Sequence, residues 1–206
     1  RDLSTFDYLD QIIEYVLSSG DFPNVKEVWV MGMSAGGRLM QRYSMLNGVQ
    51  NNYPAVDFKY VCKAIPDYLH PNAEALSSSS IREYMERKGL SPESVMEQYR
   101  TREILYITGS KDAQKYLENM DAFEAEVGDL CGENHKETKL FYKLDGAGHS
   151  EPSLTKSKMV KEFLWGNSQN NAVNDYIVAG NCRDAGSNIY TLSRTIVVEN
   201  ATSDIS

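Results

Sequence analysis

The chain has 206 residues, enough for one domain with a substantial hydrophobic core. Its formal net charge is −8 and its lysines and arginines are scattered along the sequence, so we expect no nucleic acid and no anionic membrane surface as a partner. No apolar run approaches the roughly 18–20 residues that a membrane-spanning helix needs, and we expect no membrane span.

Three cysteines bear on redox state and location. None of them has the Cys-x-x-Cys spacing of a metal or redox site, so we expect no metal. Cys62 lies in an apolar run and is expected to be buried, whereas Cys131 and Cys182 lie in polar segments and are the pair most compatible with a disulfide. With the glycosylation sequon Asn200-Ala201-Thr202, this favours an extracellular or secretory-pathway protein, with the cytoplasm as the alternative.

The apolar pattern alternates between helical and extended periods over residues 1–166. The expected helices cover residues 5–17, 35–46, 115–127 and 154–165, and the expected strands cover residues 25–31, 58–65, 104–108 and 138–144. Because helices alternate with strands, we expect an α/β fold with a mostly parallel sheet flanked by helices.

Two segments depart from this alternation. Residues 66–100 contain a run of four serines and two short helical patterns, 81–88 and 91–99, which is typical of a helical lid insertion, although a solvated connector is the alternative. Residues 167–206 are polar, with strand-like patterns at 176–179 and 190–198 that predict a β-hairpin. We therefore expect a core of residues 1–166 followed by a tail with a hairpin appendage.

The clearest functional signal is the sequence Gly-Met-Ser-Ala-Gly at residues 32–36, between an expected strand and an expected helix. A serine in a sharp turn between a strand and a helix has a strained backbone. We expect Gly32 and Gly36 to avoid the clash that a Cβ would cause there. The helix directs its positive dipole end and the backbone N–H of Ala35 toward Ser34, where an oxyanion would form. The pattern predicts a nucleophile; a glycine-rich turn with an incidental serine is the alternative.

Two further candidates follow the ends of later strands. Asp112 follows the third strand and His149 follows the fourth. Because open α/β sheets place their sites at the carboxyl ends of the strands, we expect both to lie near Ser34. Asp67, just after the second strand, is the alternative acid. His70 and His135 lack such a position and are expected to have no catalytic role.

These motifs resemble those of one superfamily. Residues 32–37 are similar to the nucleophile elbow of esterases, residues 109–112 to an acid loop, and residues 146–149 to a Gly-x-Gly-His histidine loop. Their order along the chain, serine, aspartate, histidine, is that of the α/β-hydrolases. Residues 25–165 thus resemble the carboxyl-terminal half of an α/β-hydrolase fold.

The resemblance implies an esterase-type serine hydrolase. Ser34 would attack the carbonyl of a small-molecule ester, His149 would act as general base, and Asp112 would orient the imidazole, with no cofactor. Peptidases, thioesterases and lipases share this machinery, so the resemblance does not identify the substrate. The alternative is a hydrolase-derived structural or interaction subunit in which the triad is idle.

The resemblance also implies missing parts. In α/β-hydrolases several strands precede the nucleophile strand, and a loop from that half supplies the second oxyanion donor, whereas here one helix precedes it. The nucleophile strand would then expose an apolar edge, which natural proteins avoid. We therefore expect an amino-terminal fragment or a partner chain that completes the sheet and supplies the second donor, which this chain lacks.

Overall fold

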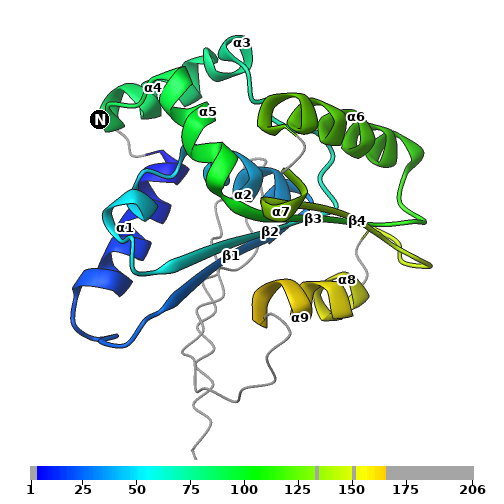
Figure 1. The fold of residues 1–206 in the computed structure, drawn as a ribbon, viewed down its shortest axis with the longest axis horizontal. Helices are drawn as coiled ribbons and strands as arrows, with labels where there is room; N and C mark the ends of the chain where they lie inside the picture. The colour runs from blue at the N-terminus through cyan, green and yellow to red at the C-terminus, as the bar shows by residue number, and fades with distance from the viewer. Residues whose placement is uncertain (1–3, 133–134, 150–151, 166–206) are drawn as a thin grey trace, which may run out of the picture.

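The computed structural model describes residues 4–132, 135–149 and 152–165. Within these ranges four parallel strands form one sheet in the order β1-β2-β3-β4, with helices on both faces (Figure 1). The strands are β1 (Glu27–Met33), β2 (Asp57–Lys63), β3 (Glu103–Gly109) and β4 (Lys139–Leu144). The helices are α1 (Thr5–Ser18), α2 (Ala35–Leu46), the 3-10 helix η1 (Val49–Asn52), α3 (Ala73–Leu76), α4 (Ser79–Lys88), α5 (Pro92–Thr101), α6 (Gln114–Cys131), α7 (His135–Thr138), α8 (Pro152–Lys156) and α9 (Lys158–Trp165). The predicted α/β architecture with a parallel sheet is confirmed.

Some predictions concern parts of the chain outside these ranges. The hairpin expected in residues 167–206, the sequon at Asn200 and the predicted disulfide partner Cys182 all lie there. In the part of the chain that the structure describes, no helix is long and apolar enough to cross a membrane.

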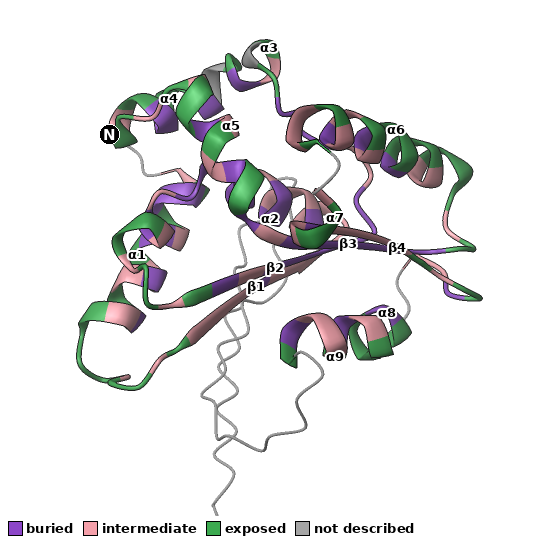
Figure 2. Ribbon diagram, in the orientation of Figure 1, coloured by how far each residue is buried: buried purple, intermediate pink, exposed green. Residues whose placement is uncertain are grey.

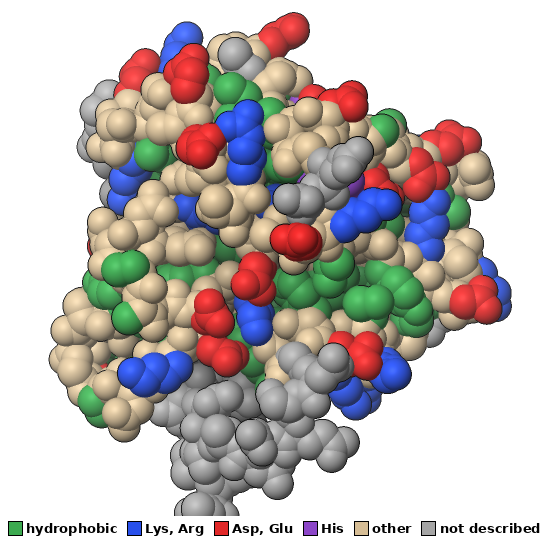
Figure 3. Space-filling model, viewed as in Figure 1, with side chains coloured by type: hydrophobic (Ala, Val, Ile, Leu, Met, Phe, Trp, Pro, Cys, Tyr) green, Lys and Arg blue, Asp and Glu red, His purple; other side chains and the backbone are tan. Residues whose placement is uncertain are grey.

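The sheet separates two hydrophobic cores. The larger core packs α1, α2 and α4 to α6 on one face, around side chains such as Tyr60 and Tyr106, and the smaller packs α8 and α9 against Val61 and Leu105 on the other. Figure 2 shows the buried residues concentrated in β2 and β3, between the two layers of helices. Figure 3 shows hydrophobic side chains at the level of the sheet, between the upper helices and α8 and α9. Because β2 and β3 are covered on both faces, they have the nearly continuous burial of inner parallel strands.

The last predicted helix, residues 154–165, is two helices in the structure. Ser157 lies between α8 and α9, where its hydroxyl accepts a hydrogen bond from the backbone N–H of Val160 at 3.2 Å and donates to the carbonyl of Leu154 at 3.4 Å. A serine that accepts from the third residue of the next helix is an N-cap. This local cap divides the segment.

The described cysteines are free thiols. Cys62 is buried in β2, as predicted, and burial raises the pKa of its thiol. Cys131, expected in a polar loop, is instead the last residue of α6. Since its predicted partner lies outside the described ranges, a disulfide is not shown.

The helices of residues 66–100 pack against α1 and α2, on the same face of the sheet. Tyr84 on α4 donates a hydrogen bond to Asp10 on α1 at 2.8 Å, and Gln98 on α5 donates to the carbonyl of Met45 in the last turn of α2 at 2.6 Å. Ser34 precedes the opposite end of α2. These contacts extend the helical layer, and a lid over Ser34 is not shown.

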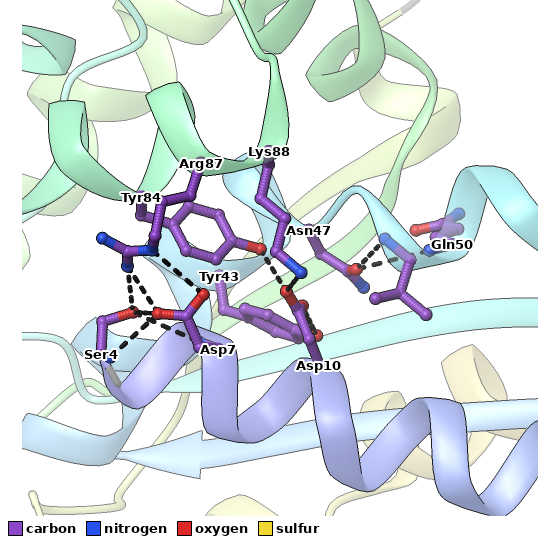
Figure 4. Close-up of polar contacts among 10 residues, drawn as sticks. Ser4, Asp7, Asp10, Tyr43, Asn47, Gln50, Tyr84, Arg87 and Lys88 are labelled. Atoms are coloured by element: carbon purple, nitrogen blue, oxygen red, sulfur yellow. Dashed lines mark hydrogen bonds and ion pairs between the residues drawn. The ribbon is translucent and has the colours of Figure 1, made fainter. Parts of the chain in front are cut away.

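A buried polar cluster holds α4 on α1 (Figure 4). Asp10 is 1% exposed; it accepts hydrogen bonds from the hydroxyls of Tyr43 and Tyr84, both at 2.8 Å, and pairs with Lys88 at 2.6 Å. Beside it, Arg87 forms an ion pair with Asp7. A buried carboxylate is tolerated only where such partners compensate its lost hydration. The cluster thereby joins α1, α2 and α4.

Candidate active site

Ser34 lies in the turn between β1 and α2 with a left-handed backbone, φ 55° and ψ −120°. A non-glycine residue there costs roughly 1–3 kcal/mol and occurs mainly at functional sites. The strain expected from the sequence is therefore present. The backbone N–H of Ser34 donates to the carbonyl of Lys63 at 2.9 Å, which ties the turn to the end of β2. Ala35 begins α2, so its N–H has no acceptor within the helix.

The glycines around Ser34 are not equivalent. A Cβ added at Gly32 would lie 2.3 Å from the carbonyl oxygen of Gly36, and one at Gly37 would lie 2.5 Å from the carbonyl oxygen of Lys63. A Cβ at Gly36 itself would meet no described atom within 4 Å. The expectation that Gly36 avoids a Cβ clash is therefore wrong. Its carbonyl group, not its Cα, makes the close approach, and Gly37 is the second glycine that the packing requires.

The structure brings the three residues predicted from the strand ends together. His149 Nε2 lies 3.0 Å from Ser34 Oγ, and His149 Nδ1 lies 2.9 and 3.1 Å from the two carboxylate oxygens of Asp112. The Asp112 side chain is 2% exposed and that of His149 is 31% exposed. In this arrangement the imidazole can accept a proton from the serine hydroxyl while the carboxylate holds its other nitrogen.

Further hydrogen bonds orient the Asp112 carboxylate. It accepts from the hydroxyl of Thr108 at 3.1 Å and from the backbone N–H of Ala113 at 2.7 Å. The loop before it is bonded to the loop that carries His149, since the backbone N–H of Lys111 donates to the carbonyl of Ala147 at 2.9 Å. The two loops meet because β3 and β4 are neighbouring parallel strands that end at the same edge of the sheet.

Asp67, the alternative acid, pairs with two arginines, whereas His149 Nδ1 faces Asp112. Its carboxylate oxygens lie 3.0 Å from Arg38 Nη1 and 3.6 Å from Arg42 Nη2, both on α2. The other two histidines have contacts of their own: His70 contacts Glu126, and His135 Nδ1 lies 2.8 Å from the carbonyl oxygen of Gly132. Among the described residues, no group of three or more histidine, cysteine, aspartate or glutamate side chains is arranged to hold a metal ion.

Sequence reasoning missed two features of the site. The helical pattern assigns Tyr116 to the apolar face of α6, but its ring lies 5.3 Å from the imidazole of His149, centroid to centroid, at an interplanar angle of 45°. Its position four residues after Asp112 is the signal that could have revealed this contact. The contact between Arg38, one helical turn after Ser34, and Asp67, the alternative acid, was also missed.

No protein-family model matches the sequence, and no curated protein matches it. Solved structures of esterases and a lipase are similar at low sequence identity. Est1E from Butyrivibrio proteoclasticus has 16% identity and a TM-score of 0.45, over 79% of this chain and 70% of its own. The propionate-bound esterase Est2 from Thermogutta terrifontis has 14% identity and a TM-score of 0.39, over 79% of this chain and 61% of its own. The monoacylglycerol lipase of Paleococcus ferrophilus has 14% identity and a TM-score of 0.40, over 80% of this chain and 76% of its own.

Proposed function

We propose that this chain is an esterase-type serine hydrolase that cleaves a carboxylic ester through an acyl-enzyme on Ser34. The observation that carries the proposal is the continuous hydrogen-bonded series from Ser34 through His149 to the buried carboxylate of Asp112. Such a series supplies a serine nucleophile with a general base and holds that base in one orientation.

The chemistry follows from this geometry. Ser34 Oγ attacks the ester carbonyl carbon while its proton passes to His149 Nε2, and Asp112 stabilises the imidazolium that forms. The backbone N–H of Ala35 donates to the carbonyl oxygen as it becomes an oxyanion. When the tetrahedral intermediate collapses, the C–O bond breaks and the alcohol leaves with the proton from His149. Water then hydrolyses the acyl-enzyme by the same sequence of proton transfers.

A fluorophosphonate probe tests this proposal. We expect the full-length protein to gain the mass of one probe less HF per chain, because the activated serine displaces fluoride from phosphorus and the serine proton leaves with it. Ser34→Ala should abolish both labelling, measured by intact-protein mass spectrometry, and hydrolysis of p-nitrophenyl acetate. Ser18→Ala, at the exposed end of α1, is the matched control. A folded protein that neither labels nor hydrolyses would instead favour the alternative, a hydrolase-derived structural or interaction subunit.

We also propose that an amino-terminal fragment or partner chain pairs a strand with β1. Of the two edge strands in the described sheet, β4 carries the exposed Lys143, and charged residues discourage pairing between edges. After Glu27, β1 is Val-Trp-Val-Met-Gly-Met, and most of these side chains are only half-buried. An added strand would cover this edge and could bring the second oxyanion donor beside Ala35.

Amide hydrogen exchange tests the pairing. In the full-length protein we expect slow exchange at every residue of β1, because a strand with neighbours on both sides has all of its N–H groups bonded. The outer edge of β4 serves as the internal reference for unpaired amides. Fast exchange at alternate residues of β1, matching that of β4, would contradict the proposal.

A further inference from the structure

Two arginines lie in the first two turns of α2, the helix that follows the nucleophile. The backbone N–H of Arg38 donates to the carbonyl of Ser34 at 2.9 Å, so it is one turn into the helix, and Arg42 follows one turn later on the same face. Long side chains on a helix lean toward its amino-terminal end, which is the end at which Ser34 lies. Both guanidinium groups contact Asp67, which follows the carboxyl end of β2. The cluster therefore shares an edge of the sheet with Ser34.

The charges in this cluster are not balanced. Asp67 is the one carboxylate that the described contacts place against both arginines, at 3.0 and 3.6 Å. Burial lowers the pKa of Arg42, and the neighbouring charge of Arg38 lowers it further, whereas Asp67 raises it. An additional anion at this position would offset the repulsion between the two arginines.

The cluster also has a donor without an acceptor. Arg42 Nε is buried and has no hydrogen-bond partner among the described residues. Leaving a buried donor unpaired is unfavourable, so such a group requires an explanation. The side chains of Arg38 and Arg42 are nevertheless 35% and 33% exposed. A ligand from solution can therefore reach part of each side chain.

We propose that Arg38 and Arg42 form a subsite for a carboxylate carried by the substrate, so that the preferred substrates are esters with a second, anionic group. This subsite rests on the proposed esterase function, because its role requires that the scissile ester binds at Ser34. A planar guanidinium binds a carboxylate through two parallel N–H donors, and this geometry gives selectivity as well as affinity. Asp67 occupies part of the subsite and the substrate carboxylate takes the remaining donors.

The test compares two esters of the same acyl length. The ratio of kcat/KM for mono-p-nitrophenyl glutarate to that for p-nitrophenyl pentanoate is expected to fall roughly 10- to 100-fold in Arg42→Met and in Arg38→Met, because each variant removes hydrogen bonds to a charged group. Arg42→Lys should give an intermediate ratio, since it keeps the positive charge but not the two parallel N–H donors of the guanidinium group. Asp67→Asn should raise the ratio by freeing both arginines. Arg82→Met, on the exposed side of α4, is the control that should not change it.

A second pair of substrates locates the carboxylate. A preference for 4-acetoxybenzoate over phenyl acetate would assign it to the alcohol part of the ester, and a preference for the glutarate monoester alone would assign it to the acyl part. Either preference supports the subsite if the arginine variants remove it. Equal kcat/KM for charged and neutral esters, unchanged in the arginine variants, would overturn it and leave the hydrolase proposal intact.

Binding without turnover separates the two proposals. Glutarate is expected to bind the Ser34→Ala variant, measured by calorimetry, and to bind at least tenfold more weakly when Arg42→Met is added. Binding of glutarate to a protein that hydrolyses no ester would support the anion subsite and reject the esterase function. No binding to a folded Ser34→Ala protein would overturn the subsite.

Discussion

Replacing Asp112 by asparagine is expected to lower kcat for p-nitrophenyl acetate by about 10⁴-fold. In the structure His149 Nδ1 faces both carboxylate oxygens of Asp112, at 2.9 and 3.1 Å, and the carboxylate is almost fully buried. An asparagine amide can instead donate to Nδ1, which moves the ring proton to Nε2 and prevents that nitrogen from accepting the proton of Ser34. The measurement is steady-state hydrolysis, with fluorophosphonate labelling of Ser34 as a second readout.

Two other aspartates test whether this effect is specific. Asp121→Asn removes an exposed carboxylate that pairs with Lys143, and we expect kcat to remain within about twofold of the wild type, as for most surface substitutions. Asp67→Asn should reduce kcat for this neutral ester by far less than Asp112→Asn, because Asp67 contacts arginines of α2. A loss near 10⁴-fold in Asp67→Asn, with a nearly normal rate in Asp112→Asn, would assign the acid role to Asp67.

Gly32→Ala and Gly37→Ala are expected to destabilise the fold by roughly 3 kcal/mol or more, or to prevent folding. Each new Cβ would lie 2.3 or 2.5 Å from a backbone carbonyl oxygen, and backbone in a sheet or helix cannot move aside as a flexible side chain can. Urea unfolding followed by circular dichroism measures the change in the free energy of unfolding.

Gly36→Ala is the matched control, in the same turn and of the same chemistry. Its Cβ would meet no described atom within 4 Å, so we expect stability to be unchanged or to increase by up to about 1 kcal/mol, the usual gain from alanine in a helix. If all three variants were equally stable, the close approach of α2 to β1 and β2 would not be the reason for these glycines.

Local patterns were enough to place most elements. Apolar residues at helical or alternating spacing predicted all four strands of the described sheet to within two residues at each end, and Ser4 caps α1 as its side chain allows. The exceptions concern the boundaries of helices, which depend on capping contacts that the spacing of apolar residues does not show. One predicted helix is divided at Ser157, and Cys131 belongs to a helix that continues past the predicted end.

The candidate site also has parts that local patterns predicted and parts that they did not. Ser34, Asp112 and His149 were predictable because each follows a strand, and parallel strands end at one edge. The sequence favoured Asp112 as the acid and left Asp67 as the alternative, because both follow strands. The distance of each from His149 depends on how two loops fold against each other. Tyr116 and Arg38 were missed for the same reason, since a helical pattern does not show which residues face a neighbouring loop.

The sequence by itself determined the mounting of the nucleophile: a strand, a strained serine and a helix whose first N–H group is unpaired, all of which depend on residues adjacent in the chain. Only the tertiary structure decided that Gly37 and not Gly36 lies against β2, that α4 and α5 pack on α1 and α2, and that two arginines of α2 share the carboxylate of Asp67. The physical reason is that these features depend on close contacts between residues far apart in the chain, which are set by the packing of whole elements.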